Sequence, residues 1–430
     1  MRNEKHPVVD IALAFLAALC CGRAAHLYLR SGLLFGTIIA FAVPPVRAQQ
    51  AGRLISMPSA SVSGVFDPSL ANMPPGQRAW MSFSAVDPSP RWPDKDSRTV
   101  TTRLAYSDDQ GATWTDLGAR INDISEGPAG SYARTWVNEV SSLVYDPNAA
   151  LDERWKLFWH HYLRVDEDGE FQNGWIGYKN AATPQVLRGA KEVKLFGARA
   201  YNADNIDPRS KTFPPVGGSP VVQADTLHND LGMCVAFSEP GAMATHSGLY
   251  MSLTCYEPKI HNVVGLLGMG LFGFKTRVIL LKCDSPCHPV SPGAWKYIAT
   301  MLTDDDAKPL GFRGYSAPDL FAQGGTAFLM VTPVSDTPWK DSYSGCDIYR
   351  FTNIETGALE QDHGKPNIVG QVRGKPGSFN GACTYQPSVA ASGFLYGEVK
   401  VADKRPFFQI FQTGAGLSEI LRRRAVGKGQ

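Results

Sequence analysis

The sequence predicts an all-β fold, and three observations lead to this expectation. The chain of 430 residues holds 42 Gly and 30 Pro. Gly costs about 1 kcal/mol and Pro about 3 kcal/mol in a helix interior, so few long helices are expected. Short runs rich in aromatic and β-branched residues, the composition of strands, recur along the chain. These runs also follow a repeated order, and the 43% of hydrophobic residues is enough for a buried core.

Five segments of the chain share one order of strands. Each segment begins with a short strand near a Pro, continues with a more apolar strand, and ends with a third strand before a polar turn. First strands are expected at residues 66–70, 139–145, 219–222, 317–321 and 386–389. Second strands are expected at residues 79–83, 155–159, 233–237, 327–331 and 394–396. Third strands are expected at residues 103–106, 175–178, 249–253, 347–351 and 407–411.

The spacing of these units leaves room for a fourth strand in each. Units of four antiparallel strands that repeat around an axis form a β-propeller. The sequence therefore predicts a five-bladed β-propeller over residues 49–415, and the alternative is a two-sheet sandwich. Residues 416–430 are expected to form a solvated basic tail, because Arg422, Arg423 and Arg424 lie at the end of the chain.

The first 48 residues have the features of a secretory signal peptide. Arg2 and Lys5 precede two apolar runs, residues 11–21 and 33–43, and a Val-Arg-Ala end closes the segment. Each run is shorter than the roughly 20 residues that a membrane-spanning helix needs. We therefore expect cleavage after Ala48 and a secreted or periplasmic protein, with an uncleaved N-terminal anchor as the alternative.

The cysteines agree with export. Two of the eight lie in the leader, and six remain for the mature chain: Cys234, Cys255, Cys283, Cys287, Cys346 and Cys383. Six cysteines can form three disulfides in fifteen pairings, and Cys283 can pair with Cys287 in a short loop. A zinc site is the alternative, but ligand spacing for it is lacking, so no metal and no cofactor are expected. His160 and His161 close a strand and are expected to be structural.

The charge limits the classes of partner. The net charge is +2, and most of it comes from the leader, so the mature chain is close to neutral. A neutral chain gives no support to a nucleic-acid partner. We expect no membrane contact beyond the leader, and a monomer.

Residues 107–114 read Ser-Asp-Asp-Gln-Gly-Ala-Thr-Trp, which fits the pattern Ser-x-Asp-x-Gly-x-Thr-Trp. This segment resembles the Asp-box of sialidases and other propellers. Asp and Gly suit a hairpin turn, and Trp114 is expected to pack beneath it. The motif is expected to be structural.

The starts of the first strands resemble those of glycoside hydrolase families 43 and 32, which are five-bladed propellers. Phe66-Asp67-Pro68 is similar to the motif of the first blade, which implies that Asp67 is a general base or a nucleophile. Residues 136–140, Trp-Val-Asn-Glu-Val, resemble a second-blade motif that places Glu139 at the acidic position. Residues 315–321, Tyr-Ser-Ala-Pro-Asp-Leu-Phe, resemble the motif of the acid/base blade in family 32.

Two departures from this resemblance concern the carboxylates. Ser316 stands where the family has its acid/base Glu, and Gly218 and Ser219 stand where the third blade would offer an Asp. The acid has therefore moved, to Asp319, Glu239 or Glu398, or the propeller uses other chemistry or only binds. Glycoside hydrolysis needs one protonated and one ionised carboxyl group on either side of the bond.

The resemblance implies a carbohydrate partner and a glycoside hydrolase that uses paired carboxylates. Asp67 is the expected base or nucleophile, and Glu139 and Asp319 are expected to share the acid and pKa-tuning roles. Trp136, Tyr315 and Tyr385 are candidate platforms for sugar stacking.

Two alternatives remain open. A non-catalytic carbohydrate-binding propeller is favoured by the serines at the expected carboxylate positions. A sialidase-type exo-glycosidase is favoured by Arg134, Arg313 and Arg373, which each precede a strand near one end of the channel and suit a carboxylate-bearing sugar.

Overall fold

The computed structural model describes residues 52–428 apart from residues 58–62, 75, 89–97, 123–133, 166–169, 199–219, 259–273, 336–344, 376–377, 390 and 403–404. The leader (1–48), Gly218 and Ser219 lie outside the described residues, as do the side chains of Arg134 and Trp136. Residues 49–430 form one compact unit. In the part of the chain that is described, no helix is long and apolar enough to cross a membrane.

The described chain is built from five antiparallel units, called blades 1 to 5 here. Blade 1 contains β2 (Val65–Leu70), β3 (Ala79–Pro88), β4 (Arg98–Ser107) and β5 (Thr115–Arg120). Blade 2 contains β6 (Arg134–Tyr145), β7 (Trp155–Val165), β8 (Glu170–Ala181) and β9 (Val193–Gly197), with β10 (Val222–Gln223) parallel to β9. Blade 3 contains β11 (Ala236–Thr245), β12 (Gly248–Pro258), β13 (Phe274–Asp284) and β14 (Trp295–Thr303).

Blades 4 and 5 complete the unit. Blade 4 contains β15 (Gly314–Gln323), β16 (Thr326–Val334), β17 (Cys346–Asn353), β18 (Ala358–Leu359) and β21 (Ile368–Val372), beside the hairpin β19 (Gln361–Asp362) and β20 (Lys365–Pro366). Blade 5 contains β22 (Phe379–Thr384), β23 (Leu395–Ala402), β24 (Arg405–Gln412) and β1 (Arg53–Leu54).

Helices are short and lie between the strands or after them. The α-helices are α2 (Asp304–Ala307) and α3 (Leu417–Lys428). The 3-10 turns are Leu151–Glu153, Pro184–Gly189, Ala224–Thr226, Asn229–Leu231, Lys308–Leu310, Ile354–Thr356 and Pro387–Val389. The all-β class predicted from the Gly and Pro content is therefore confirmed.

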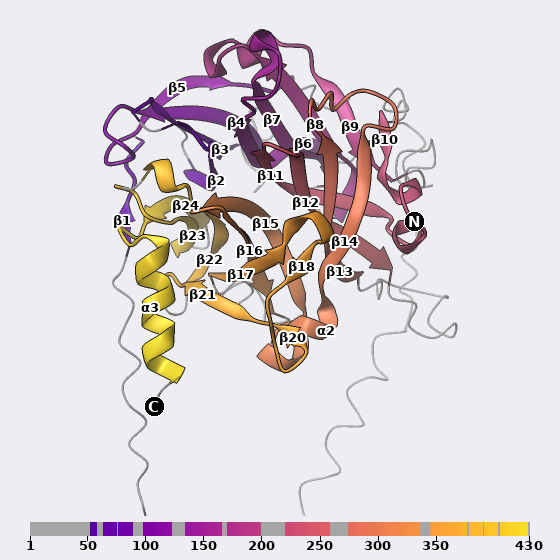
Figure 1. Ribbon diagram of the computed structural model, residues 1–430. Helices are drawn as coiled ribbons and strands as arrows, with labels where there is room; N and C mark the ends of the chain where they lie inside the picture. The colour runs from indigo at the N-terminus through magenta and orange to yellow at the C-terminus, as the bar shows by residue number, and fades with distance from the viewer. Residues whose placement is uncertain are drawn as a thin grey trace, which may run out of the picture. The chain divides into compact units, whose positions relative to one another are not determined.

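The first strand of each blade, called the inner strand below, contacts the inner strands of two neighbouring blades. The contacts run from β2 to β6, β11, β15 and β22 and return to β2. β1 then pairs with β24, with Arg53 opposite Gln412, so the first and last described strands share blade 5 (Figure 1). This cyclic order of five antiparallel blades is the arrangement expected of a five-bladed propeller.

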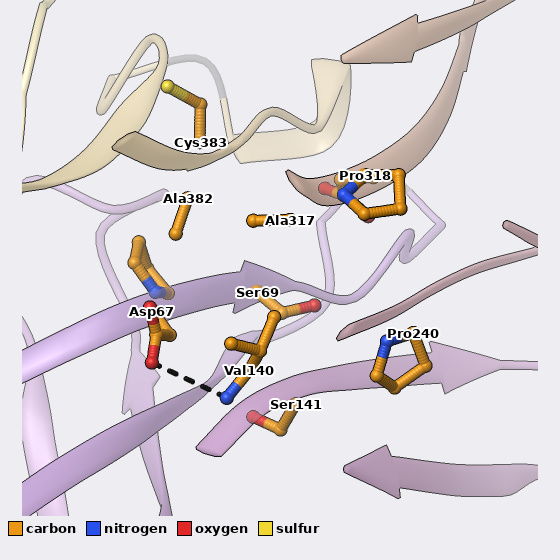
Figure 2. A pocket seen from close by; sticks show the side chains of 11 residues that line it. Asp67, Ser69, Val140, Ser141, Pro240, Ala317, Pro318, Ala382 and Cys383 are labelled. Carbon is orange, nitrogen blue, oxygen red and sulfur yellow. Dashed lines mark hydrogen bonds between the residues drawn. The ribbon is translucent and has the colours of Figure 1, made fainter. Parts of the chain in front are cut away.

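A β-bulge interrupts every inner strand at the same place. The register shifts between Phe66 and Ser69 in β2 and at the corresponding points of β6, β11, β15 and β22. One residue of each bulge has a left-handed backbone: Asp67 (φ 49°), Val140 (45°), Glu239 (57°), Ala317 (44°) and Ala382 (50°). Such backbones cost on the order of 1–3 kcal/mol each and cluster at functional sites. Four of these residues surround one space in Figure 2.

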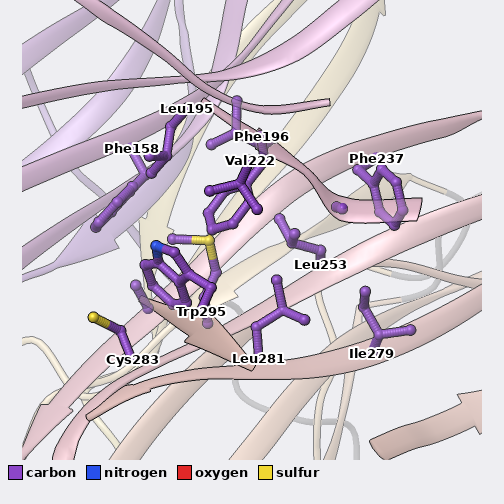
Figure 3. Packing of buried hydrophobic residues seen from close by; sticks show 14 of the residues in the cluster. Phe158, Leu195, Phe196, Val222, Phe237, Leu253, Ile279, Leu281, Cys283 and Trp295 are labelled. Carbon is purple, nitrogen blue, oxygen red and sulfur yellow. The ribbon is translucent and has the colours of Figure 1, made fainter. Parts of the chain in front are cut away.

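Apolar side chains fill the spaces between neighbouring blades. The cluster in Figure 3 joins Phe158 and Phe196 of blade 2 to Phe237, Leu253 and Trp295 of blade 3. Further clusters join blades 1 and 2, 3 and 4, 4 and 5, and 5 and 1. Every blade face therefore buries its apolar residues against the next blade, which fixes the inner strands around the centre.

The disulfide expectation is confirmed. The six cysteines pair as Cys234–Cys255, Cys283–Cys287 and Cys346–Cys383. The last of these connects β17 of blade 4 to β22 of blade 5.

Two predicted first strands are wrong, and so is the nature of the tail. Residues 222–223 form β10 at the outer side of blade 2, and β11 is the inner strand of blade 3. Residues 387–389 form a 3-10 turn, and β22 is the inner strand of blade 5. Residues 417–428 are helical, and Leu417 and Ile420 are buried in the cluster between blades 4 and 5.

The turn at residues 107–114 has the expected structure. Ser107 Oγ accepts a hydrogen bond of 2.7 Å from the Gly111 N–H, and the Asp109 carboxylate accepts two from Thr113. These bonds lower the pKa of Asp109 to about 2. Trp114 is buried in the cluster between blades 5 and 1, so the segment is a structural hairpin between β4 and β5.

Candidate active site

A pocket of about 250 Å³ lies where the five bulges meet. Every inner strand contributes to its wall, and Figure 2 shows the side chains around it. The lining residues are Asp67, Pro68, Ser69, Val140, Ser141, Pro240, Ala317, Pro318, Asp319, Ala382 and Cys383.

Asp67 is the most buried carboxyl group of the pocket, with 5% of the residue exposed. Ser84 Oγ donates a hydrogen bond of 2.8 Å to Asp67 Oδ2, and the Val140 N–H donates one of 3.4 Å to the same oxygen (Figure 2). Burial raises the pKa of Asp67 well above its usual value, and the charges of Glu139 and Glu239 raise it further. Asp67 therefore lies in a group of three interacting acids.

Glu139 is the residue before the bulge of β6. The Tyr162 hydroxyl donates a hydrogen bond of 2.8 Å to Glu139 Oε1 and fixes the side chain. Its charge raises the pKa of both Asp67 and Glu239. Glu139 is thus placed to change the titration of its two neighbours, and its expected share in the acid and pKa-tuning roles stays a prediction.

Glu239 occupies the bulge of β11 in the same way that Asp67 occupies the bulge of β2. Both have a left-handed backbone, and both precede a Pro. Glu239 Oε2 accepts hydrogen bonds from Thr254 Oγ1 at 3.1 Å and from the Ala317 N–H at 2.8 Å. Burial is the main cause that raises the pKa of Glu239 to about 7.

The third blade therefore does offer a carboxylate. From the sequence, residues 219–222 were expected to be the first strand of the third unit, so Ser219 was compared with the acidic position. Glu239 was expected at the end of the second strand of that unit. The structure places Glu239 on the inner strand β11. The acid-Pro pair shared by Asp67-Pro68 and Glu239-Pro240 is the signal that could have identified it.

Asp319 lines the pocket from β15, two residues after the bulge residue Ala317. Its carboxylate accepts a hydrogen bond of 2.9 Å from the Leu320 N–H and another from the Thr384 hydroxyl. Burial raises the pKa of Asp319 to about 7. Ser316, which precedes the bulge, occupies the position that Glu139 has in β6, so blade 4 supplies its acid three residues later.

Glu398, the third acid considered from the sequence, lies elsewhere. It is buried in β23, opposite Asn380 and Gln409, and is not among the lining residues.

The two predicted tyrosine platforms do not reach the pocket. Tyr315 is 1% exposed, and its hydroxyl lies 3.0 Å from that of Tyr349 within the cluster between blades 3 and 4. Tyr385 is also buried, and its ring stacks on Phe394 at 4.3 Å. Both rings pack inside the protein, so the stacking role expected of them is wrong.

The arginines are distributed differently from the expectation. Arg373 forms an ion pair of 2.6 Å with the buried Asp347. Arg313 is exposed, and it is absent from the described lining. The described part of the pocket wall therefore contains neither of these two guanidinium groups.

The two histidines have a structural environment. Both are buried, and burial lowers the pKa of each to about 3. His161 Nδ1 contacts Asn138 Oδ1, which also accepts a hydrogen bond from Trp159 Nε1. Neutral, enclosed rings of this kind support the sheet.

One group of potential metal ligands is found among the described residues: Cys234, Cys255 and Glu257. The two sulfur atoms are bonded to each other, so they are not thiolate ligands.

Comparisons with known proteins give matches among solved structures. No family model matches the sequence. A search of curated proteins finds no match. A Bombyx mori family 32 β-fructofuranosidase mutant in complex with sucrose is 12% identical, with a TM-score of 0.43, over 84% of this chain and 61% of that one. The native arabinanase of Bacillus subtilis is 15% identical, with a TM-score of 0.42, over 82% of this chain and 95% of that one.

A family 32 glycoside hydrolase from Bifidobacterium adolescentis is 13% identical, with a TM-score of 0.43, over 86% of this chain and 60% of that one. This chain thus spans less than two thirds of the length of the two family 32 proteins. The solved structures to which the chain is similar include glycoside hydrolases of families 32 and 43, at low identity.

Proposed function

We propose that this protein is a glycoside hydrolase that cleaves a glycosidic bond between Asp67 and Glu239. One observation carries the proposal: the two carboxyl groups occupy equivalent bulges of the inner strands β2 and β11 and interact electrostatically within one group of acids. Two carboxyl groups in different protonation states are what this reaction needs.

The electrostatics support a division of roles. The charge of Glu139 raises the pKa of both Asp67 and Glu239, and Glu239 also raises that of Asp67, so these two acids hold their protons more tightly than isolated carboxyl groups do. Glu239, whose pKa is about 7, is the proposed acid that gives its proton to the leaving glycosidic oxygen. Asp67 accepts hydrogen bonds from Ser84 Oγ and the Val140 N–H, which oppose the larger pKa-raising effect of burial, and it is the proposed base or nucleophile.

Glu139 is proposed to keep the acid protonated. Its negative charge disfavours ionisation of Glu239 until a substrate is bound. Asp319 was a further candidate for the acid.

The experiment measures hydrolysis of sucrose, arabinan and a panel of 4-nitrophenyl glycosides, because two of the similar structures are a sucrose complex and an arabinanase. Asp67→Asn and Glu239→Gln are expected to lower kcat by roughly 10²–10⁴-fold, the usual contribution of a general acid or base. Asp108→Asn, which removes an exposed carboxylate paired with Arg78, is the matched control and should keep full activity.

Chemical rescue adds a second readout. In Asp67→Ala and Glu239→Ala, azide or formate should restore part of the activity by taking the place of the missing carboxylate. Folded variants at either position that retain full activity would contradict the proposal. Binding of sugar without cleavage by the wild-type protein would instead favour the carbohydrate-binding alternative.

We also propose that the protein is exported. The basic and apolar pattern of residues 1–48 supports this, together with three disulfides, which persist in oxidising compartments. N-terminal sequencing of the secreted protein should begin at Gln49, and a product that retains residue 1 would favour an anchor.

A further inference from the structure

Asp319 is the lining carboxyl group that the proposed pair of catalytic acids leaves without a role. It comes from blade 4, whereas Asp67 and Glu239 come from blades 1 and 3. It lines the pocket together with the small side chains of Ala317 and Ala382.

The Asp319 carboxyl group is held by elements of two blades. The Leu70 N–H donates a hydrogen bond of 3.1 Å to Thr384 Oγ1. Because a hydroxyl has one proton to donate, Thr384 directs that proton to Asp319. The Leu320 N–H supplies a second bond to Oδ1. Thr384 is fully buried, so this orientation is rigid.

The Asp319 carboxylate still has acceptor sites that a ligand can use. An ionised carboxylate has about four acceptor sites, and the two donors from the protein occupy two of them. The group can therefore accept a hydrogen bond from a ligand hydroxyl or ammonium, and in its protonated form it can donate one. This behaviour differs from that of a carboxylate enclosed on all sides.

The charged side chains in the described part of the pocket wall are all acidic. The described lining contains two carboxyl groups, Asp67 and Asp319, and otherwise Pro, Ala, Val, Ser and Cys, with no Lys, Arg or His among these residues. Glu139 adds negative charge beside Asp67. A ligand carboxylate in this space would be repelled by these acids, and the described lining offers no cation to pair with it. Ligands that carry a carboxylate should therefore bind poorly.

We infer that Asp319 binds a hydroxyl or ammonium group of the sugar held between Asp67 and Glu239, and that the pocket thereby selects neutral and amino sugars over sugars that carry a carboxylate. This inference rests on the proposed function. It also separates the protein from the sialidase-type alternative, which needs a cationic site.

The first test compares three 4-nitrophenyl glycosides: the neutral glycoside that the wild-type protein cleaves best, its amino analogue and its uronic acid analogue. The wild-type kcat/KM for the uronide should be at least roughly 100-fold below that for the neutral sugar, since unpaired buried charges are heavily penalised. Asp319→Asn should narrow this gap by roughly 10-fold, because it removes one repelling charge. An unchanged gap overturns the charge-selection part of the inference.

The second test concerns binding. Asp319→Ala should raise KM for the neutral glycoside by roughly 10- to 100-fold with a much smaller change in kcat, as expected for a lost hydrogen bond to a charged group. Thr384→Val, which removes the hydroxyl that orients Asp319, should give a smaller rise in KM. Asp108→Asn is the control with the same change of charge at an exposed site, and it should leave KM unchanged.

Two further measurements test the inference independently of catalysis and of folding. Calorimetric binding of the neutral sugar to Asp67→Asn, with and without Asp319→Ala, measures affinity without turnover. Thermal melting identifies variants that do not fold. If Asp319→Ala does not fold, the rise in KM expected of Thr384→Val becomes the test of the inference. Equal affinity with and without Asp319 overturns the inference but leaves the proposed hydrolysis intact. A wild-type protein that neither cleaves nor binds any of the probes overturns the proposed function, and the inference with it.

Discussion

Asp67 and Glu239 occupy the same position of the inner strand in blades 1 and 3, each with a left-handed backbone and each followed by a Pro. At each bulge, the side chains no longer alternate regularly between the two faces of the strand. Three other blades place Val140, Ala317 and Ala382 at the same position. All five positions therefore share one backbone conformation, and only blades 1 and 3 place an acid there. The proposed chemistry depends on these two side chains, which the repeated bulge positions.

Replacement of Glu139 should move the pH profile toward acid. The negative charge of Glu139 raises the pKa of Asp67 and of Glu239. Glu139→Gln removes that charge, so both limbs of the pH dependence of kcat/KM should shift down, by about half a unit to one unit. Initial rates between pH 3 and 9 check this, with Asp108→Asn as the control. Limbs that stay in place, or that move to higher pH, contradict the assigned role.

Glu239 should lower the stability of the folded protein at alkaline pH. Its folded pKa of about 7 lies above the ordinary value of 4.5. The folded state therefore binds the proton more tightly, and the contribution of Glu239 to stability falls as pH rises from about 4.5 through 7. Glu239→Gln should then be more stable than the wild type by roughly 2 kcal/mol at pH 8 and nearly equal to it at pH 4. Urea unfolding at the two pH values measures the difference, and equal differences at both would contradict the raised pKa.

The ion pair between Lys156 and Asp146 should be needed for folding. The Lys156 Nζ lies 3.0 Å from Asp146 Oδ2, and both side chains are almost fully buried. Lys156→Ala leaves a buried carboxylate without its partner, and a loss of roughly 3–5 kcal/mol in unfolding free energy is expected. Lys308→Ala, which breaks an exposed pair with Asp305, is the matched control and should cost less than about 1 kcal/mol. Similar losses in the two variants would refute the prediction.

The Cys346–Cys383 disulfide should matter more than Cys283–Cys287. The first closes a separation of 37 residues and the second a separation of 4. Longer loops lose more entropy when they are closed, so Cys346→Ala with Cys383→Ala should destabilise by roughly 2–5 kcal/mol, and the short-loop pair by less. Cys383 also lines the pocket, so the first double variant should lose activity at temperatures below its melting point. Thermal melting and rates at 20–40 °C measure both effects.

The sequence predicted the strands that bury two apolar faces, and it missed two of the five inner strands, β11 and β22. The second strands at 79–83, 155–159 and 327–331 fall within β3, β7 and β16. The inner strand β11 was missed because it contains Glu239, Pro240 and Gly241, which are typical of a turn. β22 was missed for a similar reason, since it contains an Asn-Gly pair. From local sequence alone, these residues predict turns that end a strand. In the structure, pairing with the neighbouring strand continues past them and forms a bulge.

The site was predicted in part for the same reason. Asp67 and Asp319 line the pocket, and Glu139 interacts with Asp67. Glu239 required knowledge of which strand is innermost, which depends on pairing with residues 248–256 of β12. The tyrosines were misplaced because an aromatic ring at a strand start fits a binding surface and a contact between blades equally well from composition alone.

The pairing of β1 with β24 has a consequence for how the chain acquires its structure. Arg53 and Leu54 meet Gln412 and Phe411, so the first described strand finds its partner only after nearly the whole chain has been made. Contacts of such long sequence separation form slowly, because a large loop must be closed before any bond is gained. β1 can therefore pair with β24 only after residue 412 has been made. Removal of residues 53–54 would leave the edge of β24 without its partner strand in the finished molecule.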